Sequence, residues 1–316
     1  MAEIGTDIAK ARKCLEGGGL VAIPTETVYG LAANAFNPDA VARVFAAKQR
    51  PAFDPLIVHV ASYGQALKLT RNMPEQAAQL ATRFWPGPLT MLLQRKPEIP
   101  DLVTSGLDTV GIRLPSQSLT RKLIASLEFP LVAPSANPFG YVSPTTPEHV
   151  NDQLGDKIDY ILDGGTCQVG IESTIVGFEG GRVKVHRLGG ISVEELEEEL
   201  EAEVEVNTHS TSNPKAPGML ENHYSPATPI RLGSIPQLMQ EYAGKRVGVL
   251  SFHKAVKEGR VLAPDQSLTT AAKNLFSYLR ELDKEGYDII LAELVPNTGL
   301  GLAINDRLTR ASAKRN

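Results

Sequence analysis

The sequence predicts an α/β protein of two domains. Short apolar stretches of strand length alternate with longer stretches whose apolar residues recur at helical spacing, which is typical of packed α/β layers. The segment from Asn207 to Pro229 is rich in Ser, Thr and Asn, contains four prolines and has neither period, so we predict a linker there. It separates a larger domain, residues 1–206, from a smaller one, residues 230–316.

Composition narrows the class of protein. The 316 residues are 42% hydrophobic and 22% charged with a net charge of -4, which is typical of a globular protein without a general basic field for nucleic acid or anionic membranes. Cys14 and Cys167 lie far apart, in no metal-ligand or redox spacing. The N-terminus lacks the apolar core of a signal peptide, and no apolar run approaches the roughly 20 residues of a membrane span. We therefore expect a cytosolic protein without membrane contact.

The first predicted elements are a helix and a buried strand. Asp7 is placed to cap a helix that stops at the glycines 17–19. Residues 20–23 form an apolar run that ends at Pro24, as a short buried strand does. Gly30 is expected to allow a tight turn or a close approach of the backbone to a ligand.

A second helix and strand follow, and both carry charged or polar groups at their ends. Asn37 is the expected N-cap and Pro38 the first helical residue. The helix ends in the basic run 48–51, and a buried strand over 56–60 carries His59. Ligand sites in α/β proteins usually lie at such ends, although cations at a helix C-terminus also favour the helix dipole.

The rest of the larger domain continues the alternation. One helical region is predicted to begin at residue 62 or 63 and to continue over 74–84. Another is predicted over 117–127, and a third begins with a capping box at Ser192. The predicted loops are 97–100 and 140–147, and the predicted strands are 89–93, 110–114, 131–133, 160–162, 174–178 and 183–188.

The smaller domain reads as strand, helix, strand, helix. The strands are predicted over 246–250 and 287–292, and the helices over 268–282 and 304–313, which suggests some parallel pairing. Gly299-Leu300-Gly301 is a fragment of a glycine-rich loop without a full dinucleotide fingerprint.

Cations, hydroxyls and amides gather at the predicted strand ends and loops of the larger domain. Such a set suits an oxygen-rich anion, because arginine holds carboxylate or phosphate with two parallel bonds and lysine acts as a point charge. Turn chemistry and capping also account for many Ser and Thr residues at such places. The residues are Lys48, Arg50, His59, Arg113 and Arg187, with Thr27, Thr109, Ser135, Asn137, Ser143, Thr145 and Ser173.

Several other chemistries lack their motifs. The sequence has no Walker-type loop, no Gly-x-Ser-x-Gly elbow and no His-Glu-x-x-His pair. A pair of carboxylates for glycoside cleavage stays open, but no pair stands out. The residues alone therefore indicate an anion-binding α/β enzyme.

The same residues carry a family resemblance over nearly the whole chain. The sequence resembles the threonylcarbamoyl-AMP synthase family in its long form, which implies a twisted mixed-sheet YrdC-like domain followed by a smaller Rossmann-like α/β domain. The matching pieces, in family order, are PTETVYGLAANA, KQRPAFDPLIVHV, WPGPLT, TVGIRLP, APSAN, SPTTPEHV, GIESTIV, the Arg187 region, PGMLENHYSP and GLGLAINDRL.

The resemblance implies a reaction and a set of sites. Such enzymes combine L-threonine, bicarbonate and ATP into threonylcarbamoyl-AMP and release pyrophosphate. A partner transferase then modifies adenosine 37 of tRNAs that read codons beginning with A. The implied threonine site contains Thr27, His59, Arg113, Ser135 and Ser173, and the implied ATP site contains Arg50, Asp54, Thr109, Asn137, Thr145, Arg187 and Tyr224.

Catalysis would rest on Lys48 and Arg50, with Lys48 beside the phosphates and with Mg²⁺ carried by ATP and no protein ligands to the metal. Replacing either residue with alanine is expected to abolish pyrophosphate release and leave the fold intact. Asp54 stands where the family commonly has Asn, and Leu220 and Glu221 replace basic linker residues. The linker, through Tyr224, is expected to act as a mobile cover over the site.

Two alternatives remain at the level of sequence. A double-stranded RNA or tRNA-binding module without catalysis would bind tRNA in a strongly salt-dependent way, and the acidic balance argues against it. A weak contact with tRNA stays open. A carbamoyl transferase of related fold would need zinc-finger cysteines that this sequence lacks.

Overall fold

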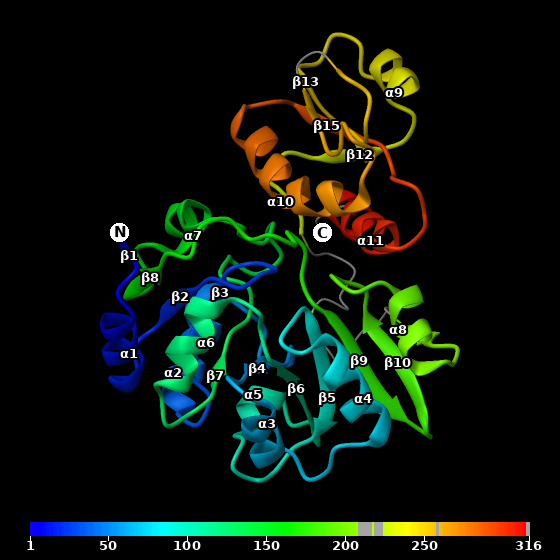
Figure 1. Ribbon diagram of the computed structural model, residues 1–316. Helices are drawn as coiled ribbons and strands as arrows, with labels where there is room; N and C mark the ends of the chain where they lie inside the picture. The colour runs from blue at the N-terminus through cyan, green and yellow to red at the C-terminus, as the bar shows by residue number, and fades with distance from the viewer. Residues whose placement is uncertain (208–216, 218–223, 257–258, 314–316) are drawn as a thin grey trace.

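The computed structural model describes residues 1–207, 217, 224–256 and 259–313, which form two lobes (Figure 1). The strands of the first lobe are β1 (Glu3–Gly5), β2 (Val21–Ile23), β3 (Gly30–Asn34), β4 (Ile57–His59), β5 (Leu89–Gln94), β6 (Thr109–Arg113), β7 (Leu131–Val132), β8 (Tyr160–Leu162), β9 (Thr174–Glu179), β10 (Arg182–Arg187) and β11 (Glu205–Val206). Its helices are α1 (Ile8–Glu16), α2 (Pro38–Lys48), α3 (Tyr63–Leu69), α4 (Glu75–Phe84), α5 (Asp101–Thr104), α6 (Ser118–Ala125), α7 (Pro147–Leu154) and α8 (Val193–Leu200).

The first lobe is built on one mixed sheet. Within the described residues its strand order is β1-β8-β2-β3-β7-β4-β6-β5-β9-β10-β11. The sheet contains both parallel pairs, such as β4 with β6, and antiparallel pairs, such as β5 with β6. The register of β4 and β6 sets His59 opposite Arg113, and an isolated bridge joins Gly30 to Ser135. Residues far apart in the sequence therefore meet at one end of these strands.

The second lobe is a small parallel α/β unit. Its strands are β12 (Ile230–Leu232), β13 (Val247–Ser251), β14 (Gly259–Val261) and β15 (Ile289–Ala292), and its helices are α9 (Ile235–Glu241), α10 (Leu268–Lys284) and α11 (Leu300–Ser312). The strand order β12-β15-β13-β14 is parallel throughout. The α/β class, the mixed sheet and the Rossmann-like second unit are thus confirmed. Residues 193–206 pack on the first lobe, since α8 contacts α4 and β11 pairs with β10.

The lobes share an apolar core and a set of polar contacts. Helices α10 and α11 face the first lobe (Figure 1). The core around these helices includes Val28, Val142 and Ile171 from the first lobe. Arg280 of α10 is buried and donates to the carbonyl oxygens of Val142 and Ser143, the latter at 3.2 Å. Among the described residues no helix is long and apolar enough to cross a membrane.

Local capping follows the sequence closely. The Asp7 side chain accepts from the amides of Ala9 and Lys10, and the Asn37 side chain caps α2 with Pro38 in the first turn. Helix α2 ends because Gln49 adopts a left-handed conformation with φ 53°. The chain then turns back, which brings Arg50 against Asp54. The capping box at Ser192 is also present.

Other expectations are corrected. Gly30 lies in β3 and makes no turn: a Cβ there would lie 3.0 Å from the Ala133 Cβ, so the close approach is to a neighbouring segment. Helix α4 is separate from α3. Helix α11 begins at residue 300, earlier than predicted, and Gly301 packs against Pro296, so the glycines serve a helix start and not a dinucleotide loop. The sequence prediction missed β1, β3, β11, β12, β14, α5, α7 and α9.

Candidate active site

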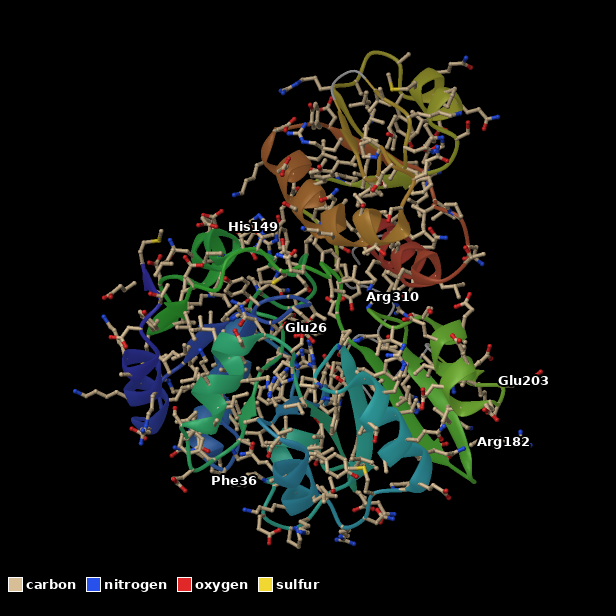
Figure 2. All side chains as sticks on the ribbon, in the orientation of Figure 1. Glu26, Phe36, His149, Arg182, Glu203 and Arg310 are labelled. Atoms are coloured by element: carbon tan, nitrogen blue, oxygen red, sulfur yellow. The ribbon has the colours of Figure 1, made fainter. Side chains whose placement is uncertain are left out.

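A pocket lies where the first lobe meets Pro217 and Tyr224 of the linker. Three guanidinium groups, those of Arg50, Arg113 and Arg187, line it together. Glu26, which contacts Arg113, lies near the centre of the molecule, whereas Arg182 and Glu203 lie at its outer edge (Figure 2). The remaining lining residues are Val28, Ile57, His59, Ala133, Pro134, Ser135, Glu172, Pro217 and Tyr224.

Arg113 ends β6 and is held by two side chains of the segment after β2. Its Nη2 donates to Glu26 Oε1 and to Thr27 Oγ1, each at 2.8 Å. Glu26 also accepts from the Ser116 amide at 3.1 Å. The Nε of Arg113 is buried and has no hydrogen-bond partner among the residues that the structure describes. The Nη2 of this guanidinium is therefore fixed, while its Nε is unpaired within the described part of the chain.

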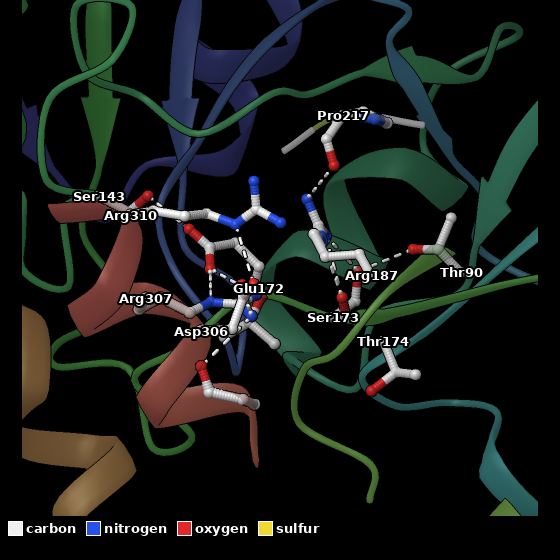
Figure 3. Close-up of polar contacts among 12 residues, drawn as sticks. Thr90, Ser143, Glu172, Ser173, Thr174, Arg187, Pro217, Asp306, Arg307 and Arg310 are labelled. Atoms are coloured by element: carbon white, nitrogen blue, oxygen red, sulfur yellow. Dashed lines mark hydrogen bonds and ion pairs between the residues drawn. The ribbon is translucent and has the colours of Figure 1, made fainter. Parts of the chain in front are cut away.

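Arg187 ends β10 and is hydrogen-bonded to Ser173, the residue directly before the neighbouring strand β9 (Figure 3). Its Nε and Nη2 donate to the Ser173 carbonyl oxygen at 3.1 and 3.0 Å, and Nη2 reaches Ser173 Oγ at 3.0 Å. Ser173 Oγ also lies 2.8 Å from Thr90 Oγ1. The Nη1 of Arg187 donates to the Pro217 carbonyl at 3.3 Å. Burial lowers the pKa of Arg187.

Lys48 is the last residue of α2 and Arg50 lies two residues beyond it, and the two side chains contact different partners. Arg50 Nη2 lies 2.9 Å from Asp54 Oδ2 and donates to the Pro55 carbonyl at 2.9 Å. Lys48 is buried, and its Nζ donates to the carbonyl oxygens of Ser135 and Asn137 at 2.5 and 2.6 Å. Lys48 does not line the pocket but supports the segment that does, so its direct contact with phosphate stays a prediction. Burial, with Arg50 nearby, lowers the pKa of Lys48.

His59 is a neutral imidazole in this site. Burial, followed by the neighbouring Arg113 charge, lowers its pKa to about 3. Its Nδ1 lies 3.3 Å from the Ile57 carbonyl oxygen. At neutral pH this side chain therefore offers hydrogen bonding without charge.

The remaining predicted residues divide into two groups. Ser135 and Tyr224 line the pocket. Asn137 and Thr145 are buried behind it: the Asn137 amide donates to the Pro138 and Tyr141 carbonyls at 2.8 and 2.9 Å, and the Thr145 Oγ1 lies 3.3 Å from His149 Nδ1. Thr109 opens β6, so it lies about 13 Å along the strand from Arg113, outside the pocket lining. Their roles in ATP binding stay predictions. Leu220, Glu221 and most of the linker lie outside the described residues.

Sequence reasoning missed the two carboxylates of the site, Glu26 and Glu172. Both lie beside predicted residues, in PTET and GIEST, but an isolated carboxylate has no periodic or spacing signal. Glu172 accepts from Ser143 Oγ at 2.6 Å, which also gives the role of that predicted hydroxyl.

The free space within the pocket is about 40 Å³, far below the 300 to 1,000 Å³ usual for a small-molecule site. Its lining must therefore move to admit a nucleotide.

Comparison with known proteins identifies the family of this chain. Residues 13–189 match a family model described as telomere recombination, and residues 191–313 match one described as threonylcarbamoyl-AMP synthase, C-terminal domain. Threonylcarbamoyl-AMP synthases of Pyrococcus abyssi and Bacillus subtilis are each 42% identical, over 94% and 98% of this chain and 92% and 93% of theirs. A crystal structure of P. abyssi Sua5 complexed with L-threonine has a TM-score of 0.92 at 39% identity and covers 99% of this chain and 97% of that chain. The chain belongs to the threonylcarbamoyl-AMP synthase family.

Proposed function

We propose that this protein synthesises threonylcarbamoyl-AMP from L-threonine, bicarbonate and ATP with release of pyrophosphate. It is a nucleotidyltransferase whose product serves the N6-threonylcarbamoylation of adenosine 37 in tRNAs that read codons beginning with A. The full-length match to curated synthases supports this activity over an RNA-binding module without catalysis and over a carbamoyl transferase.

The observation that carries the proposal is the convergence of Arg50, Arg113 and Arg187 on one pocket. Two of the substrates are anions, a triphosphate and an amino-acid carboxylate, and guanidinium groups bind both through paired hydrogen bonds. In a pocket largely shielded from water these charges act strongly and are already oriented. The site can thus hold two anions side by side.

The chemistry needs placement more than it needs a covalent nucleophile on the protein. The amine of threonine attacks CO₂ and loses a proton, or it attacks bicarbonate, and the lost proton and hydroxide then leave as water. Either route gives a carbamate. An oxygen of the resulting carbamate then attacks the α-phosphorus of ATP, and pyrophosphate leaves. Arg113, with Thr27, His59, Ser135 and Ser173, would hold threonine, while Arg50 and Arg187 would neutralise phosphate charge.

The cofactor and partners follow from this chemistry. We expect a magnesium ion to arrive bound to the triphosphate of ATP, without ligands from the protein. Such an ion would shield the triphosphate charge. A tRNA threonylcarbamoyl transferase would consume the product. The two cysteines are free thiols, which supports the cytoplasm as the compartment.

The test is pyrophosphate release from ATP with bicarbonate, comparing threonine with serine and with no amino acid. We expect release that depends on threonine. Arg113→Met should reduce kcat/KM for threonine about 10- to 100-fold, because a hydrogen bond to a charged group contributes about 1.5–3 kcal/mol. Arg182→Met, at the exposed outer edge, is the matched control. Binding of tRNA without any threonine-dependent release would overturn the proposal.

A further inference from the structure

Glu172 places a negative charge in a pocket built to attract anions. It lines the pocket, directly precedes Ser173, and is only 6% exposed. Burial lowers the pKa of Arg187, and the negative charge of Glu172 partly offsets this lowering. An unpaired carboxylate here would compete with the substrates for the guanidinium groups of the site.

The partner of Glu172 comes from the other lobe. Arg307 of α11 is completely buried, and its Nε and Nη2 donate to Glu172 Oε2 at 3.2 Å each, while Ser143 binds Oε1 (Figure 3). Arg307 also stands over the ring of Tyr224, with 5.3 Å between its Cζ and the ring centroid. This one side chain of the second lobe therefore contacts two residues that line the pocket.

Arg307 does not carry the attachment of the lobes alone. Arg280 is bonded to backbone carbonyls of the first lobe, and the apolar core continues across the interface. Lys284 and Asp152 form a further ion pair between the lobes, with side chains 61% and 42% exposed and distant from the lining of the pocket. Exposed pairs of this kind contribute little to stability. Removal of Arg307 should therefore leave the lobes joined.

We propose that Arg307 is a positioning residue of the second lobe, which neutralises Glu172 and holds its carboxylate away from the anion-binding arginines of the first lobe. Without Arg307, Glu172 would be free to turn to Arg113 or Arg187 and occupy donors that the threonine carboxylate and the phosphates need. The inference rests on the proposed function, and it gives the C-terminal domain a part in substrate binding.

The experiment combines three variants of the full chain. We expect Arg307→Met to raise the KM for threonine, and the Kd for threonine measured by calorimetry, at least about tenfold, a factor that corresponds to about 1.4 kcal/mol. The double variant Arg307→Met/Glu172→Gln should recover at least half of that loss on a logarithmic scale, because the unpaired charge is gone. Lys284→Ala, at the same interface, should behave as wild type.

The outcomes separate the possible failures. A wild-type enzyme without threonine-dependent turnover would overturn the proposed function, while the calorimetric comparison would still test Arg307. If the wild type is active, an unchanged threonine KM and Kd in Arg307→Met would overturn the inference. A double variant with the same KM and Kd as Arg307→Met would overturn it as well. A purely structural role predicts lower stability with an unchanged threonine Kd of the folded Arg307→Met variant. Should Arg307→Met fail to fold, Arg307→Gln, which keeps donors and removes the charge, carries the same comparisons.

Discussion

Acid should weaken the first lobe through His59. This side chain is 2% exposed, and its pKa falls from 6.5 to about 3 because of burial and the nearby Arg113 charge. In the unfolded chain the imidazole is hydrated and binds a proton as the pH falls through 6.5. The unfolded state then binds more protons than the native state, so stability is lost as the pH falls from about 6.5 towards 3.

The size of this loss follows from the shift. Each pH unit below the unfolded pKa and above the native pKa costs about 1.4 kcal/mol. At about pH 5 the contribution of His59 to the free energy of unfolding should therefore be lower by about 2 kcal/mol than at about pH 7.5. His149, whose pKa is lowered to about 4 mainly by burial, acts in the same direction and remains in every variant compared.

Urea unfolding followed by the fluorescence of Trp85 measures this directly. It is the single tryptophan of the chain, and it is packed in the core of the first lobe. Between about pH 7.5 and about pH 5, wild type should lose about 2 kcal/mol more than His59→Gln. His253→Gln, on the second lobe, is the control and should lose as much as wild type. An equal loss in wild type and His59→Gln would refute the reasoning.

Two further substitutions test particular contacts. Lys48→Met keeps the length of the side chain but leaves the Ser135 and Asn137 carbonyls without their donor, so we expect a loss of about 2–4 kcal/mol in urea unfolding together with lost pyrophosphate release. Stability within about 0.5 kcal/mol of wild type would contradict the structural role of Lys48. Gly301→Ala would place a Cβ 1.9 Å from the Pro296 carbonyl oxygen and should lower the thermal midpoint strongly. Gly299→Ala meets open space, but the backbone there (φ 51°, ψ -129°) is strained for any other residue and should cost about 1–3 kcal/mol; a loss from Gly301→Ala no larger than this would contradict the packing argument.

The elements that the sequence predicted well carry strong local signals. Helix α2 has a side-chain cap, a proline in its first turn and a periodic apolar face, and the structure begins and ends it where these signals lie. The strands β1 and β12 have three residues each and contain a charged residue, so they lack the apolar run that predicted equally short strands such as β2 and β8. Their pairing with β8 and β15 depends on contacts distant in sequence.

At the site, too, the sequence predicted the types of residue but not the directions in which their side chains point. Positive charge after α2 and at the ends of β6 and β10 could be read from the sequence, but the direction of each side chain could not. Lys48 turns inward to the Ser135 and Asn137 carbonyls, whereas Arg50 reaches the pocket, because the left-handed Gln49 between them reverses the chain. No local pattern reveals such a choice.

The charges around the pocket explain how it can bind an anion although acids are present. Arg50 and Arg113 each have a carboxylate within 2.9 Å, from Asp54 and Glu26. Glu26 accepts from Nη2 of Arg113 and leaves its Nε unpaired among the described residues, so we expect a substrate carboxylate to bind at Nε without displacing Glu26. The hydrogen-bond partners of Arg187 within the described chain are neutral oxygens, so we expect its charge to be available to a phosphate group.

Glu172 is the acid that lines the pocket itself, and it forms an ion pair with Arg307 of the second lobe. The positive charge that the first lobe offers to its substrates is therefore set in part by the second lobe. An isolated first lobe would keep Glu172 and lose Arg307, and the acid would then face Arg187 in the same pocket. On this reasoning the second lobe belongs to the binding site electrostatically, although the guanidinium groups that line the pocket come from the first.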